Sequence, residues 1–336
     1  LSMTINPEKQ AAQEIERLLK FPGFLRRESF AKGRSEIVEL RIDNKSKLKN
    51  VKLMDMSNVV KCRVLVCAVL RAGNAVAPSG NFVLKEGDRI FVTAPSANLT
   101  VLLKNLGIIT KRIRRVMLCG GDRISHYLVQ LLAKEGISVD IIEKDPARCR
   151  ELAERLPDAD VILGDCSDQK FLESEGLADC DALVTLTGID EMNMIISLYG
   201  NSQNVPQVIT KLGHIANRSI IDMLNLGSVV CPKDLVVSNI VRYVRAMQNQ
   251  TGAAISVHSI ADSQVEAVEF LVEQDTQHCG EALKSIKLRN DMLLVSITHG
   301  SVTEIPGGDS SFQKGDTVVV VTNGRGKLRQ LNDIFA

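Results

Sequence analysis

The chain lacks several features that mark large classes of protein. Its 336 residues contain no Trp and only three Tyr, and aromatic residues make up 4% of the sequence, which leaves little surface on which bases could stack. The 41 basic and 40 acidic residues give a formal net charge of +1, so no excess of positive charge is available to neutralise nucleic-acid phosphates. No apolar run approaches the roughly 18 residues that a bilayer span requires. We therefore expect no nucleic-acid partner and no direct membrane span.

Closely spaced metal ligands are also missing. The eight cysteines form no C-x-x-C pair and no cluster with histidine, whereas structural zinc sites need such spacing. They stand at Cys62, Cys67, Cys119, Cys149, Cys166, Cys180, Cys231 and Cys279. The pattern predicts no metal site and is typical of reduced thiols in the cytosol.

What the sequence does contain is an internal repeat of long period. At about 150 residues per domain, the length suggests two or three domains. LKEGDRIFV at 84–92 matches FQKGDTVVV at 312–320, and both follow a Pro-x-Gly turn. Each copy alternates apolar and polar residues between glycines and prolines, as half-buried antiparallel strands do. The repeat predicts two small α+β domains of one kind, over residues 26–110 and 253–336.

Residues 111–232, between the two copies, have a different pattern. Short apolar runs such as RVMLC and ADVIL alternate with helical segments such as ISHYLVQLLAKEG. Gly136 is suited to end that helix and Pro146 to begin the next. Strands that alternate with helices indicate βαβ units. We therefore expect an α/β fold here, a doubly wound, Rossmann-like domain with a parallel sheet.

A helical segment is repeated as well. INPEKQAAQEIER at 5–17 matches VCPKDLVVSNIVR at 230–242, which predicts crossover helices over 1–25 and 233–252. The second copy follows the doubly wound domain, whereas no such domain precedes the first. We therefore expect the chain to be part of a larger tandem protein whose first dinucleotide-type domain is absent from this sequence.

The second crossover helix carries an apolar stripe of Val237, Ile240, Val241 and Val244. Two interpretations of this stripe stay open. It is either buried within the monomer, or it is a surface through which the chain associates with copies of itself.

The turn after the first strand of the middle domain differs from the usual G-x-G-x-x-G of dinucleotide folds. RVMLC runs into GGDRIS, so Gly120 keeps the first glycine position, Asp122 takes the second and Ser125 the third. An Asp there adds bulk and a like charge where phosphates approach the backbone. Glu143 ends the second predicted strand, where a carboxylate can accept hydrogen bonds from ribose hydroxyls.

Three further loops follow predicted strands, where ligands gather in open α/β sheets. They are GDCSD at 164–168, TLTGIDEMN at 185–193 and ITKLGH at 209–214. Thr187 and Gly188 can approach an adenosine or ribose, and Lys211 can pair with a phosphate. Asp168 is expected to cap the helix that follows it.

The order of GGDRIS, IIEKD, GDCSD, TLTGIDEMN and ITK resembles the N-terminal domain of the RCK (regulator of potassium conductance)/TrkA family, and the flanking repeats resemble its TrkA-C domain. The resemblance covers essentially the whole chain. It implies a cytosolic regulator that catalyses no reaction and is peripheral to the inner face of the cell membrane. Such a regulator assembles as a dimer or ring on a membrane potassium transporter of Trk or Ktr type. The implied ligand is NAD(H) or, alternatively, ATP or ADP.

The resemblance also assigns positions to a nucleotide site. The positions are Gly120, Gly121, Asp122, Arg123, Ile124, Glu143, Thr187, Gly188 and Lys211. The chain departs from the family pattern with Asp122 and Ser125 in place of glycines and with Lys211 in place of Arg. These departures predict that a nucleotide binds weakly or not at all at this site.

Two other functions remain open from the sequence. One is an NAD-dependent oxidoreductase, although no Tyr-x-x-x-Lys pair occurs and the five His are dispersed, so no catalytic residue is predicted. The other is a structural scaffold with a degenerate nucleotide site.

Overall fold

The fold consists of two units, each with its own core. The computed structural model describes residues 4–20, 23–108, 112–214, 221, 224, 226–247, 254–262, 264–323 and 328–336. Unit 1 joins Leu1–Leu25 to Lys111–Val237, and unit 2 joins Arg26–Thr110 to Ser238–Ala336. Within the described ranges, no helix combines the length and the apolar character needed to cross a membrane.

Unit 1 is built on a sheet of six parallel strands in the order β11-β10-β9-β6-β7-β8. The strands are β6 (Arg115–Cys119), β7 (Ser138–Glu143), β8 (Ala159–Leu163), β9 (Ala182–Thr185), β10 (Gln207–Lys211) and β11 (Ser228–Val230). Counted from β6, this order is 3-2-1-4-5-6, the order of dinucleotide-binding doubly wound sheets. The predicted Rossmann-like α/β fold is confirmed.

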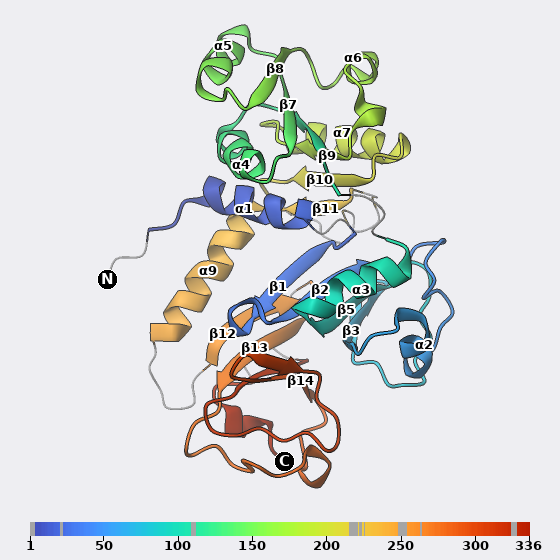
Figure 1. Ribbon diagram of the computed structural model, residues 1–336, viewed down its shortest axis with the longest axis vertical. Helices are drawn as coiled ribbons and strands as arrows, with labels where there is room; N and C mark the ends of the chain where they lie inside the picture. The colour runs from blue at the N-terminus through green and yellow to red at the C-terminus, as the bar shows by residue number, and fades with distance from the viewer. Residues whose placement is uncertain are drawn as a thin grey trace. The chain divides into compact units, whose positions relative to one another are not determined.

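Helices cover both faces of this sheet. In Figure 1, α4 and α5 lie on one face and α6 and α7 on the other. Their bounds are α4 (Arg123–Lys134), α5 (Pro146–Arg155), α6 (Gln169–Ser174) and α7 (Asp190–Ser202). An Asp side chain caps each of the first three, namely Asp122, Asp145 and Asp168, because its oxygen accepts the free N–H groups of the first turn. Gly136, just beyond α4, has a φ of +68°, which favours glycine.

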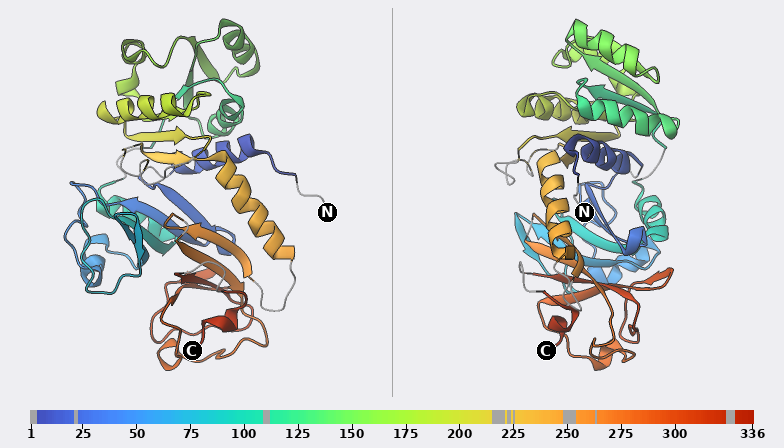
Figure 2. Two further views of the ribbon diagram at one scale, coloured as in Figure 1. Left: turned by 180° about the vertical axis from the view of Figure 1, so that it is seen from behind. Right: turned by 90° about the vertical axis from the view of Figure 1, so that its left-hand side faces the viewer.

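The N-terminal helix α1 (Pro7–Lys20) belongs to this unit. It packs along α4 and β11, and Figure 2 shows it beside them. Its apolar face is fully buried through Ala11, Ala12, Ile15, Leu18 and Leu19. The first of the two repeated helices is therefore part of the doubly wound domain's core.

Unit 2 holds two antiparallel five-stranded sheets of the same topology, β1-β2-β5-β3-β4 and β12-β13-β16-β14-β15. The first copy comprises β1 (Arg26–Phe30), β2 (Ser35–Arg41), α2 (Met56–Val60), β3 (Leu65–Arg71), β4 (Asn74–Val76), β5 (Arg89–Pro95) and α3 (Ser96–Leu106). The second comprises β12 (Ala254–Ile260), β13 (Val265–Leu271), β14 (Met292–His299), β15 (Val302–Glu304), β16 (Thr317–Thr322) and the 3-10 helix η5 (Leu331–Ile334). The equal strand order confirms two small domains of one kind.

The two copies in unit 2 share one hydrophobic core. Phe30 and Phe91 of the first copy pack in the same cluster as Ile260 and Val319 of the second. Polar contacts cross the same boundary, among them a contact of 2.5 Å between the Glu28 carboxylate and Nδ1 of His258. The repeat is therefore an intramolecular pair of domains.

The second repeated helix, α9 (Pro232–Met247), differs from α1 in burial. Val237, Ile240 and Val244 are 59%, 45% and 48% exposed. The side chain of Val241, the fourth residue of the predicted stripe, lies outside the described residues. The described part of the stripe is therefore not buried within the monomer.

Candidate functional site

The turn between β6 and α4 lies at the carboxyl edge of the parallel sheet, where ligands bind in such folds. Gly120 has a φ of +110°, and a Cβ there would come within 2.8 Å of the Leu186 carbonyl oxygen. Only glycine therefore lets this turn approach the loop after β9 so closely. The Ser125 hydroxyl donates to the Gly120 carbonyl at 2.6 Å, so the serine in the third fingerprint position ties the turn to the helix.

Asp122 occupies the N-terminus of α4 with its own carboxylate. Its Oδ1 accepts the N–H groups of Ile124 at 2.8 Å and Ser125 at 3.0 Å. Its Oδ2 pairs with the Lys211 ammonium at 3.2 Å. These N–H groups and the positive end of the helix dipole are what a helix N-terminus offers to a phosphate. In this structure the protein's own side chain takes them.

Glu143, at the end of β7, supports the same turn. Its Oε2 accepts the Gly121 N–H at 2.8 Å, and its Oε1 accepts the N–H groups of Lys144 and Asp145 at 2.8 and 3.0 Å. A carboxylate offers about four acceptor positions. Three are used, so one remains for a ribose hydroxyl.

The loop after β9 is held by a buried residue that the sequence did not single out. The Asn193 side chain accepts the Thr187 N–H at 2.9 Å and the Thr187 hydroxyl at 2.7 Å. Its amide donates to the carbonyls of Thr187 and Lys211, each at 3.1 Å. Asp190 fixes the neighbouring loop by accepting the Gly213 N–H. Residues 187–193 have the spacing T-x-x-D-E-x-N, and its Thr, Asp and Asn thus join the ends of β9 and β10.

Lys211 links these parts, because its ammonium also donates to the Thr187 carbonyl at 3.2 Å. The remaining predicted positions are more peripheral. Ile124 is buried in the core and presents only its backbone to the turn. Arg123 is 83% exposed and lies 3.9 Å from Glu8. A Cβ on Gly188 would meet no heavy atom within 4 Å, so the backbone there is open to a ligand.

These residues fit one part of a nucleotide better than another. The free acceptor position of Glu143 suits a ribose. A pyrophosphate in the usual place does not fit the turn as it stands, because the N–H groups of Gly121, Ile124 and Ser125 are already paired with carboxylates. A phosphate must displace Asp122 to reach the N–H groups of Ile124 and Ser125.

Comparison with known proteins assigns the two kinds of domain. Residues 116–232 match the TrkA-N domain, and residues 37–107 and 267–336 match the TrkA-C domain. The chain belongs to the TrkA family.

Relatives that match nearly the whole of this chain agree with this assignment. A Trk system potassium uptake protein TrkA homolog of Archaeoglobus fulgidus is 27% identical over 331 residues, which are 98% of this chain and 73% of that protein. The Trk system potassium uptake protein TrkA of Haemophilus influenzae is 24% identical over 334 residues, 98% of this chain and 72% of that one.

Solved structures share the fold. The GsuK channel superposes with a TM-score of 0.51 at 13% identity, covering 95% of this chain and 56% of that chain. The GsuK RCK domain gives a TM-score of 0.50 at 12% identity, covering 96% and 68%. At these identities the likeness concerns the fold alone.

Proposed function

We propose that this chain is a nucleotide-sensing regulatory subunit of a membrane potassium transporter and that it catalyses no reaction itself. The observation that carries the proposal is the match of 98% of the chain to proteins named for potassium uptake. That match includes the doubly wound domain and both small domains. It favours regulation over the oxidoreductase alternative.

The ligand in this proposal is NAD(H) or, alternatively, ATP or ADP, held in the crevice between the turn and the loop after β9. Glu143 is expected to accept a ribose hydroxyl, and an acid in that place disfavours a 2′-phosphate. Asp122 competes with the phosphates for the α4 N-terminus, so the expected affinity is low.

Lys211 is the residue best placed to respond to a phosphate. It pairs with Asp122 of the turn and donates to Thr187 of the loop after β9. An anion that attracts this ammonium weakens both contacts together. Such a ligand regulates transport only if it binds one arrangement of the domains more tightly than another, since equal affinity shifts nothing.

The partners in this proposal are a Trk- or Ktr-type transporter and further copies of this chain, as a dimer or ring on the inner face of the membrane. The exposed stripe of α9 supports assembly. Its residues Val237, Ile240 and Val244 correspond in the repeat to Ala12, Ile15 and Leu19 of α1, which are buried. Apolar side chains that remain exposed on a helix are typical of an interaction surface.

Thermal denaturation with and without nucleotide tests the sensing role. A ligand present at 100 times its dissociation constant stabilises the native state by about 2.7 kcal/mol, so NADH, ATP or ADP is expected to raise the melting temperature. Glu143→Ala is expected to reduce that increase, whereas Glu154→Ala, an exposed acid on α5, leaves it unchanged. If no nucleotide raises the melting temperature of the parent chain, the structural scaffold is the better interpretation.

Potassium uptake tests the regulatory role. In the source organism at limiting potassium, replacing the native protein with the Glu143→Ala variant is expected to alter the uptake rate, whereas Glu154→Ala keeps it. Unaltered uptake in cells that lack the protein altogether would refute the role in transport.

A further inference from the structure

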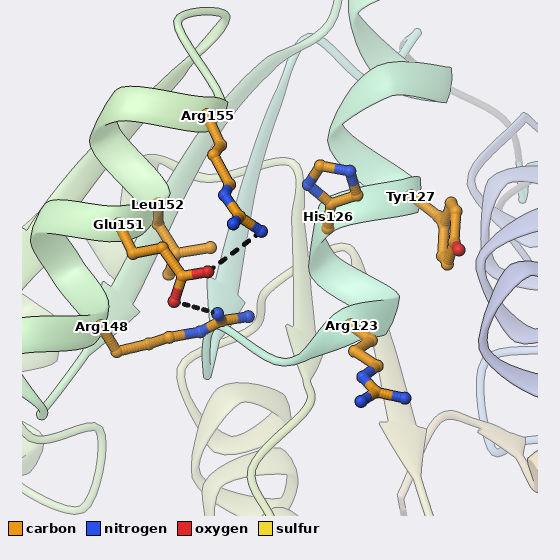
Figure 3. Close-up of a pocket in the computed structure, with 7 residues that line it drawn as sticks. All are labelled: Arg123, His126, Tyr127, Arg148, Glu151, Leu152 and Arg155. Atoms are coloured by element: carbon orange, nitrogen blue, oxygen red, sulfur yellow. Dashed lines mark hydrogen bonds and ion pairs between the residues drawn. The ribbon is translucent and has the colours of Figure 1, made fainter.

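A groove between α4 and α5 gathers positive charge outside the crevice. It encloses about 280 Å³. Its lining residues are Arg123, His126 and Tyr127 from α4, with Arg148, Glu151, Leu152 and Arg155 from α5. Figure 3 shows Arg148, Arg155 and His126 directed toward the space between the two helices, with Tyr127 turned away from it. Arg123 extends away from that space in the same view and lies 3.9 Å from Glu8, so the guanidinium groups that face the space are those of Arg148 and Arg155.

One carboxylate, Glu151, lies between Arg148 and Arg155. Glu151 pairs with Arg148 at 2.6 Å and with Arg155 at 3.0 Å. A hydrogen bond from Arg148, and the charges of both arginines, lower the pKa of Glu151, so this carboxyl remains ionised. Two arginines against one glutamate still leave the groove with an excess of positive charge, which favours an anion.

The groove begins at the turn between β6 and α4, where Asp122 already accepts the N–H groups that a phosphate would use. Arg148 Nε donates to the Gly121 carbonyl at 2.9 Å, and Leu152 forms the floor beneath Gly121. The N–H groups on the other side of that turn are paired with Asp122 and Glu143. A phosphate at the α4 N-terminus therefore competes with Asp122 for the N–H groups, whereas in the groove it competes with Glu151 for the guanidinium groups of Arg148 and Arg155.

We propose that the groove between α4 and α5 is a binding site for a linear di- or triphosphate group, separate from the nucleotide crevice. Guanidinium groups match phosphate oxygens as paired donors. Small-molecule pockets measure about 300–1,000 Å³. The groove, at about 280 Å³, is smaller, so it accommodates a short phosphate chain and not a whole dinucleotide. Glu151 serves as the internal counter-ion that the phosphate chain displaces from Arg155.

Calorimetric titration of the whole chain with sodium tripolyphosphate at constant ionic strength tests the site. Arg155→Gln is expected to weaken binding about fivefold, the scale of one charge-assisted hydrogen bond at a partly exposed site. Glu151→Gln is expected to strengthen binding about threefold, because it removes the competing carboxylate. Arg150→Gln is the matched control, since Arg150 is exposed on the same helix and does not line the groove.

Two results would overturn the proposal. One is an equal loss from Arg150→Gln and Arg155→Gln, which would mean attraction to the general charge of α5. The other is a parent chain that binds tripolyphosphate no better than polyglutamate of the same charge.

Further measurements distinguish binding in the groove from binding in the proposed nucleotide crevice. Glu143→Ala is expected to leave tripolyphosphate binding intact, and Arg155→Gln to leave adenosine binding intact. Loss of tripolyphosphate binding in Glu143→Ala would place the phosphate in the crevice and refute the groove. ATP that binds as tightly as tripolyphosphate identifies the phosphate chain as the recognised part. Tighter binding of ATP, still weakened by Arg155→Gln, identifies a nucleotide as its source.

Discussion

Replacing Asp122 tests whether the protein's own carboxylate limits nucleotide affinity. Asp122→Gly removes the carboxylate and restores the glycine usual at this fingerprint position. Asp122→Asn removes only the charge, because an amide oxygen can still accept the N–H groups of Ile124 and Ser125. The two variants therefore separate like-charge repulsion from occupation of the donors.

The magnitude follows from the contacts that Asp122 makes. It accepts two backbone N–H groups at 2.8 and 3.0 Å and pairs with Lys211 at 3.2 Å. Replacing an N-cap Asp by Gly costs a few tenths of a kcal/mol, and a partly exposed ion pair contributes about 0.5 kcal/mol, so the variant should fold. Hydrogen bonds to a charged group contribute about 1.5–3 kcal/mol each. Allowing for partial solvation, the freed donors are expected to tighten ADP binding about tenfold, or about 1.4 kcal/mol.

The assay is a calorimetric titration with ADP and with NADH at fixed salt, beside urea denaturation of each variant. Asp122→Gly is expected to bind about tenfold more tightly, and Asp122→Asn about threefold, since its donors remain paired. Asp168→Gly is the matched control, because Asp168 caps α6 through the same pair of N–H contacts at another loop. If Asp122→Gly binds no better than the parent chain, competition by the carboxylate is refuted.

Three further changes probe other parts of the molecule. Asn193→Ala is expected to lower the free energy of unfolding by about 3 kcal/mol in urea, because it leaves buried donors and acceptors unpaired; a loss below about 1 kcal/mol would contradict its role. Burial alone would raise the pKa of Glu28, but the charge of Arg26 and the hydrogen bond and charge of His258 lower it well below its usual 4.5. Its stabilising contribution is therefore present above that value and lost as the pH falls below it. Glu28→Gln is expected to cost about 2 kcal/mol at pH 7, the scale of a hydrogen bond to a charged group, and to flatten the acid limb of the stability curve; an unchanged limb would contradict this. Ile240→Asp is expected to reduce the mass of the assembly in sedimentation at high concentration without unfolding the chain; an unchanged mass would exclude α9 from the assembly.

The elements of unit 1 were predictable where the sequence pattern is local. Apolar runs of four to six residues, followed by helical periodicity, predict β6 to β10 and their helices, and the acidic cap of α6 follows from Asp168 alone. β11 was not predicted, because three residues are too few to carry a period. The pairing of Lys211 with Asp122 joins residues far apart in the chain. Nothing local in either segment specifies it.

The role of Asn193 shows what a motif can and cannot tell. The T-x-x-D-E-x-N spacing identifies a loop that precedes a helix, and an amide in the first turns of a helix is an unfavourable choice unless it has a partner. The presence of Asn193 at this helical position was therefore the signal in the sequence that its side chain has a structural partner. Its partners are the backbones of Thr187, in the loop after β9, and of Lys211, at the end of β10, and only the folded sheet brings these two places together.

The two repeated helices show the limit of pattern most plainly. Ala12, Ile15 and Leu19 of α1 occupy the same repeat positions as Val237, Ile240 and Val244 of α9, so hydrophobic periodicity predicts the same buried face for both. In the structure α1 has that face buried against α4 and β11, whereas the three α9 residues remain about half exposed. Full burial of an aliphatic side chain is worth about 1.5–3 kcal/mol. Covering the exposed half of three such residues therefore makes about 3 kcal/mol available to a partner surface. The hydrophobic pattern therefore predicts that this face is buried, but it does not specify which surface buries it.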